Sequence, residues 1–247
     1  MAENYLLIDV SNSFTKLAFA TRRRVAKATR IPTEKLTAES LRRFLRRKKI
    51  DIVAVSSVVP KKNALIRAAV KKTRVVLLSS GIELGVGIDY PKPKEIGADR
   101  LANAVAVTAF YGCPAIVVDF GTAVTFDIVS ANRKYIGGVI APGLESMTNF
   151  LYRRTALLPK LSMKEPRSAV GRSTIEAMRA GAVIGYRGLV REIIGQIKKE
   201  RFPRQRVHVI ATGGYAGLIA KRLGEIDSVH PNLTLEGLRI AANLNNR

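Results

Sequence analysis

One local pattern, strand–aspartate–turn–strand at residues 115–129, most constrains how this chain can fold. An apolar run at 115–118 ends at Asp119, a Gly-Thr pair follows at 121–122, and a second β-rich run covers 124–129. Short runs rich in Val and Ile predict buried strands, and glycine permits a tight turn. We expect a hairpin whose tip carries a carboxylate and a hydroxyl, which suits a cation and phosphate oxygens. The alternative is a core hairpin in which Asp119 only caps the turn.

The beginning of the chain carries a related pattern. An apolar run at 5–8 ends at Asp9, polar residues follow at 11–13, and a second strand-like run covers 17–20. Two such units, one in each half of the chain, indicate a duplicated architecture.

The segments between the two patterns alternate in type. Thr37 is a predicted N-cap for a basic helix, 52–59 is a β-branched run stopped by a proline, 63–72 is helical in pattern, and 75–78 is a further strand. Strand, helix, strand and helix in this order predict parallel pairing through crossover helices. The fold class is therefore α/β with mixed sheets flanked by helices.

A long loop leads into a helix whose start carries an acidic and a basic residue. Residues 81–97 contain four glycines and two prolines, and Asp99 and Arg100 stand in or just before the first turn of an Ala-rich helix at 101–110. The positive end of a helix dipole favours an anion at this place. Asp99 is either a base with Arg100 as an anion clamp, or a helix cap with a surface neighbour.

The second half continues with helices and strands. We expect a glycine-broken strand at 135–143, a helix at 144–151, and a long helix at 175–200 whose small residues indicate close packing against another helix. A strand at 207–210 precedes Thr-Gly-Gly, which could present backbone N–H groups to a nucleotide. A last helix is expected at 233–244.

The chain is strongly basic, with a formal net charge of +23. Residues 1–75 contain 19 Lys and Arg against five Asp and Glu, and six of these cations are predicted to lie on one helix: Arg42, Arg43, Arg46, Arg47, Lys48 and Lys49. Such a cluster fits either a nucleic-acid footprint or a solvated helix face. Neither interleaved aromatic residues nor a known nucleic-acid motif accompanies it.

Composition limits the remaining classes. Hydrophobic residues make up 47% and charged residues 25% of the 247 residues, which allows a sizeable core. We find no apolar run long enough to span a bilayer and no signal-peptide pattern, so we expect a cytoplasmic protein without a membrane partner. The single cysteine, Cys113, excludes an intramolecular disulfide framework.

Six motifs in order resemble those of the type III pantothenate kinases, a bacterial family of the actin, sugar kinase and heat-shock ATPase superfamily. They are DVSNSFTK at 9–16, Tyr90 with GADR at 97–100, DFGTAVT at 119–125, glycines at 137–138 with Pro-Gly at 142–143, Thr174 in GRSTIEAM, and ATGG at 211–214. The family has glycine where this chain has Ser11, which raises the question of backbone strain or close phosphate approach at that position.

The resemblance implies two ribonuclease-H-like (actin-like ATPase) domains, 1–114 and 115–247, with a cleft between them and usually a homodimer. It implies phosphorylation of pantothenate to 4′-phosphopantothenate with ATP and Mg²⁺, the first step of coenzyme A biosynthesis, activated by K⁺ or NH₄⁺. Asp99 would be the general base and Asp119 the monovalent-cation ligand. ATP would be bound by Asp9, Val10, Ser11, Asn12, Ser13, Phe14, Thr15, Lys16 and Thr122, and pantothenate by Tyr90, Gly97, Ala98, Asp99, Arg100 and Thr174.

Two other functions stay open at this point. Some members of the family have been described as accessory factors for transcription, and the net charge and Ser11 are compatible with an altered, nucleic-acid-binding member. Another small-molecule kinase of the superfamily is the second alternative. If the kinase interpretation holds, we expect any nucleic-acid binding to be weak and non-specific.

Overall fold

A computed structural model describes residues 4–46, 48–70 and 73–246, and its contacts divide the chain into two compact units. Unit 1 comprises Met1–Tyr111, Arg133–Gly137 and Asn232–Arg247, and unit 2 comprises Gly112–Asn132 and Gly138–Pro231. The C-terminal helix thus belongs with the N-terminal half. A single division of the domains between residues 114 and 115 stays a prediction.

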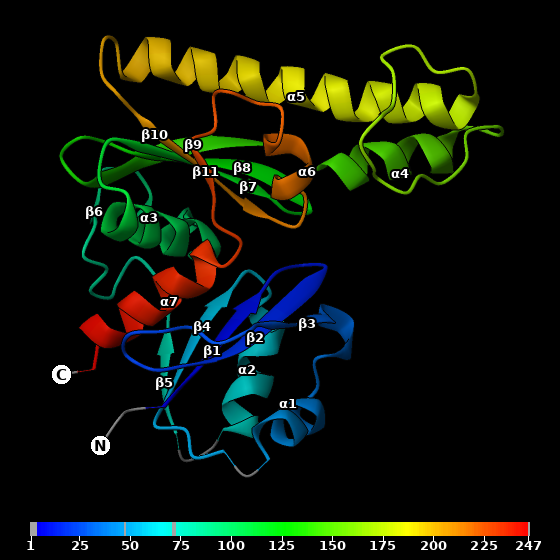
Figure 1. The fold of residues 1–247 in the computed structure, drawn as a ribbon. Coiled ribbons are helices and arrows are strands. Elements are labelled where there is room, and N and C mark those ends of the chain that lie inside the picture. Colours follow the sequence, from blue (N-terminus) through cyan, green and yellow to red (C-terminus); the bar gives the residue numbers. More distant parts are fainter. Residues whose placement is uncertain (1–3, 47, 71–72, 247) are drawn as a thin grey trace. The chain divides into compact units, whose positions relative to one another are not determined.

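Unit 1 is built on a five-stranded mixed sheet with the order β3-β2-β1-β4-β5 (Figure 1). β1 pairs with β2 in antiparallel and with β4 in parallel register, and β4 pairs in parallel with β5. The crossover arrangement expected from the strand–helix alternation is confirmed. The strands are β1 (Tyr5–Val10), β2 (Phe14–Ala20), β3 (Thr29–Pro32), β4 (Ile52–Ser57) and β5 (Arg74–Leu77).

Helices cover both faces of this sheet. On one face, Leu6, Ile8, Val53 and Val55 form a buried cluster with residues of α1 (Ala38–Leu45) and α2 (Pro60–Ala69). The opposite face carries α7 (Leu233–Leu244), which crosses α3 (Ala98–Phe110). The short elements η1 (Thr33–Lys35), β6 (Gly87–Ile88) and η2 (Pro93–Glu95) complete unit 1.

A close approach of two helices fixes the position of α7. A Cβ at Gly237 would collide with the carbonyl group of Ala102 in α3, and the Thr234 hydroxyl lies 2.9 Å from Asn103 Oδ1. Glycine is therefore required where α7 crosses α3, because any side chain would separate the helices.

The second sheet repeats the order of the first. It runs β11-β10-β7-β8-β9-β6, so β9-β8-β7-β10-β11 corresponds to β3-β2-β1-β4-β5. β7 pairs with β8 in antiparallel and with β10 in parallel register, as β1 does with β2 and β4. The predicted duplication is confirmed. The strands are β7 (Ala115–Phe120), β8 (Ala123–Val129), β9 (Lys134–Pro142), β10 (His208–Gly213) and β11 (Ser228–Val229).

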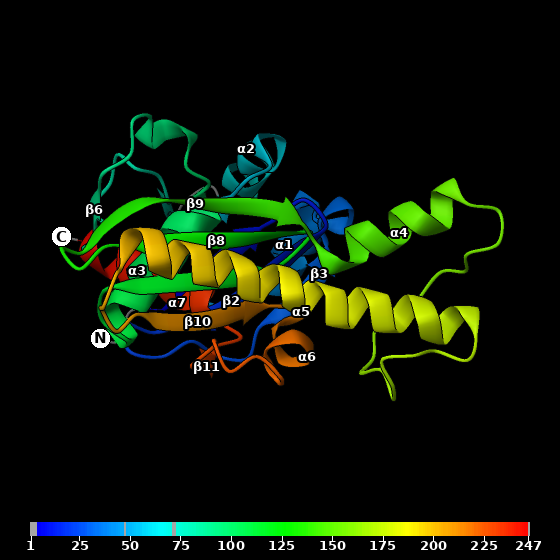
Figure 2. The same cartoon turned by 90° about the horizontal axis from the view of Figure 1, so that it is seen from above.

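A long helix lies along the sheet of unit 2 (Figures 1 and 2). This helix, α5 (Thr174–Arg201), buries Val183, Tyr186, Val190 and Ile194, whose spacing places them on one face. The first turns of α5 and most of α4 (Leu144–Arg154) project beyond the strands. The short α6 (Ala216–Ala220) follows β10.

Several predicted boundaries needed correction. Pro60 begins α2 at its first position, where the missing N–H costs nothing, whereas we expected it only to stop a strand. The basic helix α1 begins after the expected N-cap Thr37 but ends at Leu45. Lys48 and Lys49 therefore lie beyond the helix, Arg46 is its C-cap, and Arg47 lies outside the described residues.

Candidate functional site

The first predicted phosphate loop connects β1 to β2 in unit 1. Asp9 is 5% exposed and is directly opposite Lys16 in the antiparallel ladder. Val10 and Thr15 are buried, and Asn12 and Ser13 are exposed at the tip. The hairpin therefore brings the carboxylate and ammonium groups to one end of the sheet, with a polar tip beside them.

Thr33, which the sequence analysis did not single out, supports this loop. Its hydroxyl donates to the Ser11 carbonyl at 2.7 Å and lies 3.0 Å from the Thr15 hydroxyl, and its N–H donates to the Ser13 carbonyl at 3.0 Å. Ser11 is not among the residues with positive φ. The serine therefore imposes no left-handed strain where the family has glycine.

The predicted base stands in the first turn of α3. Gly97 is the N-cap, and Asp99 Oδ1 accepts the N–H of Arg100 at 2.9 Å. A Cβ at Gly97 would lie 2.5 Å from Asp99 Oδ1, so the glycine leaves room for the carboxylate. Asp99 is half-buried and is not the N-cap. Asp99 therefore lies in the first turn of α3, where the positive end of a helix dipole favours an anion.

An aromatic cluster joins two predicted substrate residues. The rings of Tyr90 and Tyr135 meet edge to face with centroids 6.2 Å apart, and the Arg100 guanidinium lies 5.7 Å from the centre of the Tyr135 ring. Gly137 lies beside the Tyr90 ring and has a φ of +124°, a backbone conformation that favours glycine. Nothing in the sequence assigns Tyr135 a role, because its neighbours identify it only as a buried strand residue.

The second hairpin places Asp119 in a crowded strand end of unit 2. Asp119 pairs with Thr125 on β8 and with Thr212 on β10. Gly213 has φ of +93°, and a Cβ there would lie 2.5 Å from Asp119 Oδ1 and 2.6 Å from the Phe120 nitrogen. Only glycine fits beside this carboxylate, because any larger residue would meet both the Cβ collision and the left-handed backbone.

The tip of the second hairpin contacts the start of α4. The Thr122 carbonyl accepts the N–H of Gly143 at 3.1 Å and the hydroxyl of Ser146 at 2.7 Å. A Cβ at Gly143 would collide with the Thr122 carbonyl. The Pro-Gly pair that ends β9 therefore permits a direct contact between the predicted phosphate-binding tip and α4.

Thr174 is exposed as the first residue of α5. Ser173 caps the helix by accepting the Glu176 N–H at 3.3 Å, and Glu176 Oε2 accepts the N–H of Arg172 at 2.9 Å. The expected close helix packing is not made at the glycines of α5. Gly181, Gly185 and Gly188 have no neighbouring atom within 4 Å of a constructed Cβ in the described part of the chain.

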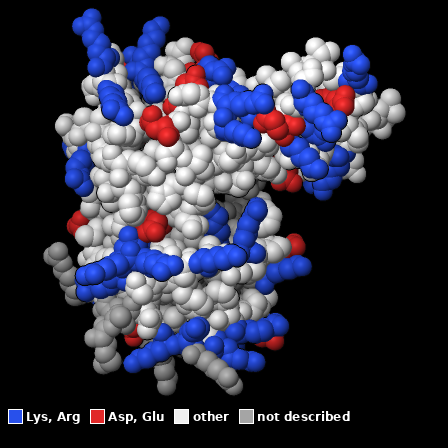
Figure 3. Space-filling model, viewed as in Figure 1, with Lys and Arg blue, Asp and Glu red and all other residues white. Residues whose placement is uncertain are grey.

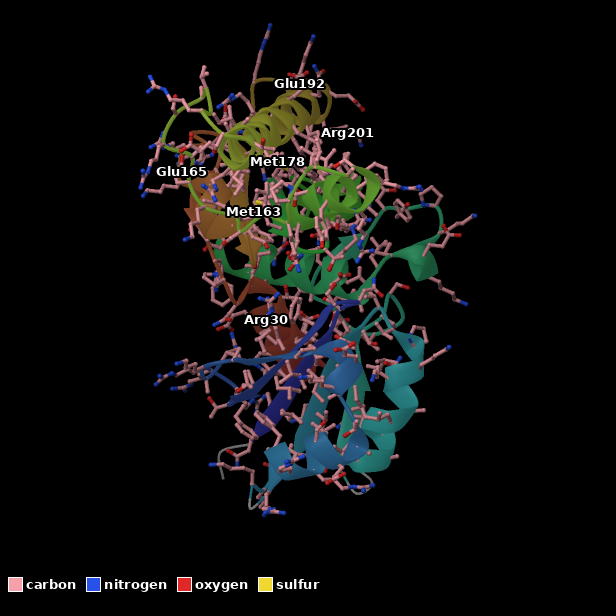
Figure 4. The ribbon with its side chains drawn as sticks, turned by 90° about the vertical axis from the view of Figure 1, so that its right-hand side faces the viewer. Arg30, Met163, Glu165, Met178, Glu192 and Arg201 are labelled. Atoms are coloured by element: carbon pink, nitrogen blue, oxygen red, sulfur yellow. The ribbon has the colours of Figure 1, made fainter. Side chains whose placement is uncertain are left out.

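The loop before α5 is held by an ion pair. Glu165, labelled in Figure 4 on the loop between α4 and α5, accepts two hydrogen bonds from Arg187, at 2.9 and 2.7 Å. Arg187 also donates to the carbonyls of Leu218 at 2.7 Å and Ile219 at 3.1 Å, in or beside α6. The pair thus joins three segments of unit 2. No sequence motif indicates this ion pair, since 22 residues separate Glu165 from Arg187.

The described residues contain no group of three or more His, Cys, Asp and Glu that could hold a metal ion. No helix among them is long and apolar enough to cross a membrane. On the face shown in Figure 3, basic side chains are spread over both units and are not confined to the α1 segment, by which we mean α1 and its C-cap Arg46.

Two mixed sheets of equal strand order, each opening on a hairpin with a strand-end aspartate, define the fold of the actin-like ATPases and sugar kinases. A hexokinase of the ROK type from Thermus thermophilus shares this fold, with a TM-score of 0.52 and 11% identity over 99% of this chain and 100% of that chain. A sequence model described as type III pantothenate kinase matches residues 5–196. The chain belongs to this family.

Two relatives agree with the family assignment, and a second solved structure shares the fold. A type III pantothenate kinase from Akkermansia muciniphila is 49% identical over 98% of this chain and 99% of its own length. Another, from Methylacidiphilum infernorum, is 43% identical over 95% of this chain and 86% of its own length. The structure of a protein described as a putative Baf family transcriptional activator from Campylobacter jejuni has a TM-score of 0.58 and 19% identity over 98% of both chains. At that identity it shows the fold alone.

Proposed function

We propose that this chain transfers the γ-phosphoryl group of ATP to pantothenate, giving 4′-phosphopantothenate and ADP in the first step of coenzyme A biosynthesis, with Asp99 as the general base. The observation that carries the proposal is the start of α3. There a half-buried carboxylate stands one residue before Arg100, whose guanidinium lies 5.7 Å from the centre of the Tyr135 ring.

The reaction needs positioning and charge neutralisation more than covalent help from the protein. The primary hydroxyl oxygen of pantothenate forms a bond to the γ-phosphorus while the bond to the β–γ bridging oxygen breaks and ADP leaves. Asp99 accepts the hydroxyl proton as the oxygen attacks. Its hydrogen bond from the Arg100 N–H fixes the direction of the carboxylate.

Substrate binding follows from the charges around this base. The Arg100 side chain can pair with the pantothenate carboxylate through charge-assisted hydrogen bonds. We assign Tyr90, residues 97–100 and Thr174 to pantothenate. Residues 9–16 and Thr122 are assigned to the ATP phosphates, since both hairpin tips present polar groups at strand ends.

The residues present fit two cations. Asp9 is buried opposite Lys16 and would hold the Mg²⁺ that accompanies ATP, which neutralises phosphate charge. Asp119, which pairs with Thr212 and leaves no room for a Cβ at Gly213, would hold K⁺ or NH₄⁺. In each place a single carboxylate is assigned to the ion, which suits a cation that is also bound by phosphate oxygens and water.

We also propose a homodimer through α4 and α5. Several apolar side chains of these helices are exposed, among them Phe150 at 60%, Tyr152 at 47% and Ile175 at 44%. The helices project beyond the sheet of unit 2, and the α5 glycines have open space beside them. Monomeric proteins rarely expose apolar patches of this kind. Because the reaction consumes ATP, we place the protein in the cytoplasm.

The activity is tested with purified protein, Mg-ATP, pantothenate and K⁺, by measuring 4′-phosphopantothenate. Asp99→Asn should lower kcat at least about 100-fold, the contribution typical of a general base, with an unchanged unfolding midpoint. Asp89→Asn is the matched control, since Asp89 is an exposed aspartate of the same unit. The base assignment is wrong if Asp99→Asn keeps near-wild-type kcat. Absence of turnover by the wild type with any monovalent cation would contradict the proposed function.

A further inference from the structure

The two sheets place an aspartate beside a hydroxyl residue at equivalent strand positions. Asp9 is the fifth of six residues in β1, and its partner on the parallel strand β4 is Ser56. Asp119 is the fifth of six residues in β7, and its partner on the parallel strand β10 is Thr212. Paired residues of neighbouring strands project to the same face of a sheet. Each strand-end aspartate therefore has a hydroxyl residue beside it.

These two hydroxyls differ from the other buried serine and threonine hydroxyls of the described residues. Ser56 and Thr212 are both 0% exposed, and neither side-chain oxygen has a hydrogen-bond partner. Among the described residues they are the only serine or threonine hydroxyls that are fully buried without one. Elsewhere, Thr234 is bonded to Asn103 and Thr148 to the Leu144 carbonyl.

A buried polar group without a partner is rare in native proteins and calls for an explanation. One chance occurrence could be tolerated as a small loss of stability. Two occurrences, at equivalent positions of a duplicated fold and each beside an aspartate assigned to a cation, indicate a shared purpose. A hydroxyl can donate one hydrogen bond and accept two, so it can join a carboxylate to a cation-bound water.

We propose that Ser56 and Thr212 are positioning residues, whose hydroxyls hydrogen-bond the oxygen shell of the cations held by Asp9 and Asp119 respectively. The inference rests on the proposed function for the identity of the two cations. Groups that orient the ligands of a metal commonly change its affinity 10- to 100-fold when they are removed. Ser56 thus serves the divalent ion of the nucleotide, and Thr212 serves the monovalent ion.

The test of Ser56 uses Mn²⁺ in place of Mg²⁺, with binding to the full chain measured by electron paramagnetic resonance in the presence of ATP. Ser56→Ala should raise the Mn²⁺ dissociation constant about 10-fold without lowering the unfolding midpoint of the ligand-free protein. Ser57→Ala is the matched control, because the Ser57 hydroxyl lies 3.2 Å from the Val59 nitrogen and serves only the local turn. This control should bind Mn²⁺ like the wild type.

The test of Thr212 measures how K⁺ shifts the unfolding midpoint in the presence of Mg-ATP. Thr212→Val keeps the side-chain shape and removes the hydroxyl, so the K⁺ concentration for half of the shift should rise about 10-fold. Thr212→Ser keeps a hydroxyl, so this K⁺ concentration should stay at the wild-type value. Of these two variants, only Ser56→Ala should weaken Mn²⁺ binding. Only Thr212→Val should weaken the response to K⁺.

The outcomes separate this inference from the proposed function. Wild-type affinities in both variants would overturn the inference even if pantothenate is phosphorylated. Equal losses for Ser56→Ala and Ser57→Ala would overturn it as well, since they indicate a general structural effect. Specific losses of cation binding in a protein that does not phosphorylate pantothenate would support the inference and contradict the function. A wild type that binds no Mn²⁺ with ATP would contradict both.

Discussion

Arg187 gives the sharpest test of how unit 2 is held together. Its side chain is 7% exposed and makes four hydrogen bonds, two to Glu165 and two to the carbonyls of Leu218 and Ile219. Arg187→Met keeps most of the apolar stem and removes every one of these bonds. The variant should therefore loosen the α4–α5 loop from α6, while the buried face of α5 stays packed.

The expected loss of unfolding free energy follows from how far Arg187 and Glu165 are buried. Removing one partner of a buried ion pair costs about 3–5 kcal/mol. The lower end applies, because the Glu165 side chain is 27% exposed and keeps Arg222 at 3.2 Å. We expect the free energy of unfolding to fall by about 3 kcal/mol. In a chain of this size this corresponds to a fall of roughly 6–12 °C in the unfolding midpoint.

The pH dependence of this loss has a definite sign. The hydrogen bonds from Arg187 hold the pKa of Glu165 below its ordinary value of 4.5, against the opposing effect of burial. A lowered folded-state pKa contributes stability that is present above the unfolded-state value and is lost as the pH falls through the folded-state value. The difference between wild type and Arg187→Met should therefore be full at pH 7 and shrink below about pH 4.5.

Guanidinium unfolding at several pH values, followed by circular dichroism, measures both effects. Arg191→Met is the control, because Arg191 on the same helix forms an exposed pair with Glu225 at 3.0 Å, and such pairs contribute little. The reasoning is refuted if Arg187→Met costs no more than Arg191→Met. It is also refuted if the loss stays constant between pH 7 and pH 3.

Two further predictions concern ions and nucleic acid. If Asp119 holds the monovalent cation, K⁺ or NH₄⁺ should activate pantothenate phosphorylation and Na⁺ should do so poorly, and equal rates in K⁺ and Na⁺ would count against this assignment. If the α1 segment is only a solvated surface, duplex DNA or RNA should bind with a Kd near or above roughly 10⁻⁴–10⁻⁶ M at physiological salt, more weakly as salt rises and without sequence preference. Changing Arg42, Arg43 and Arg46 to Glu should then leave phosphorylation almost unchanged. Tight binding to one sequence at physiological salt, with no turnover of pantothenate, would favour the transcription accessory role.

Some features of this chain are determined by sequence alone. The apolar runs that end at Asp9 and Asp119 identify both hairpins, because a buried strand needs a continuous apolar run and a tight turn needs small or polar residues. The α/β class follows from the alternation of strands and helices, and the family from six motifs in order. Each strand, turn or motif behind these conclusions is a local signal in a short run of the chain, and their order along the sequence adds the rest.

Other features are decided only by the tertiary structure. Ser56 and Thr212 acquire meaning through strand pairing, which sets each beside an aspartate about 47 or 93 positions away along the chain. Gly237 is needed only because α7 returns to cross α3. Arg187 and Glu165 meet only when the loop folds back onto α5. Contacts between distant residues leave no periodic trace in the sequence, since each depends on the packing of whole elements and not on neighbouring side chains.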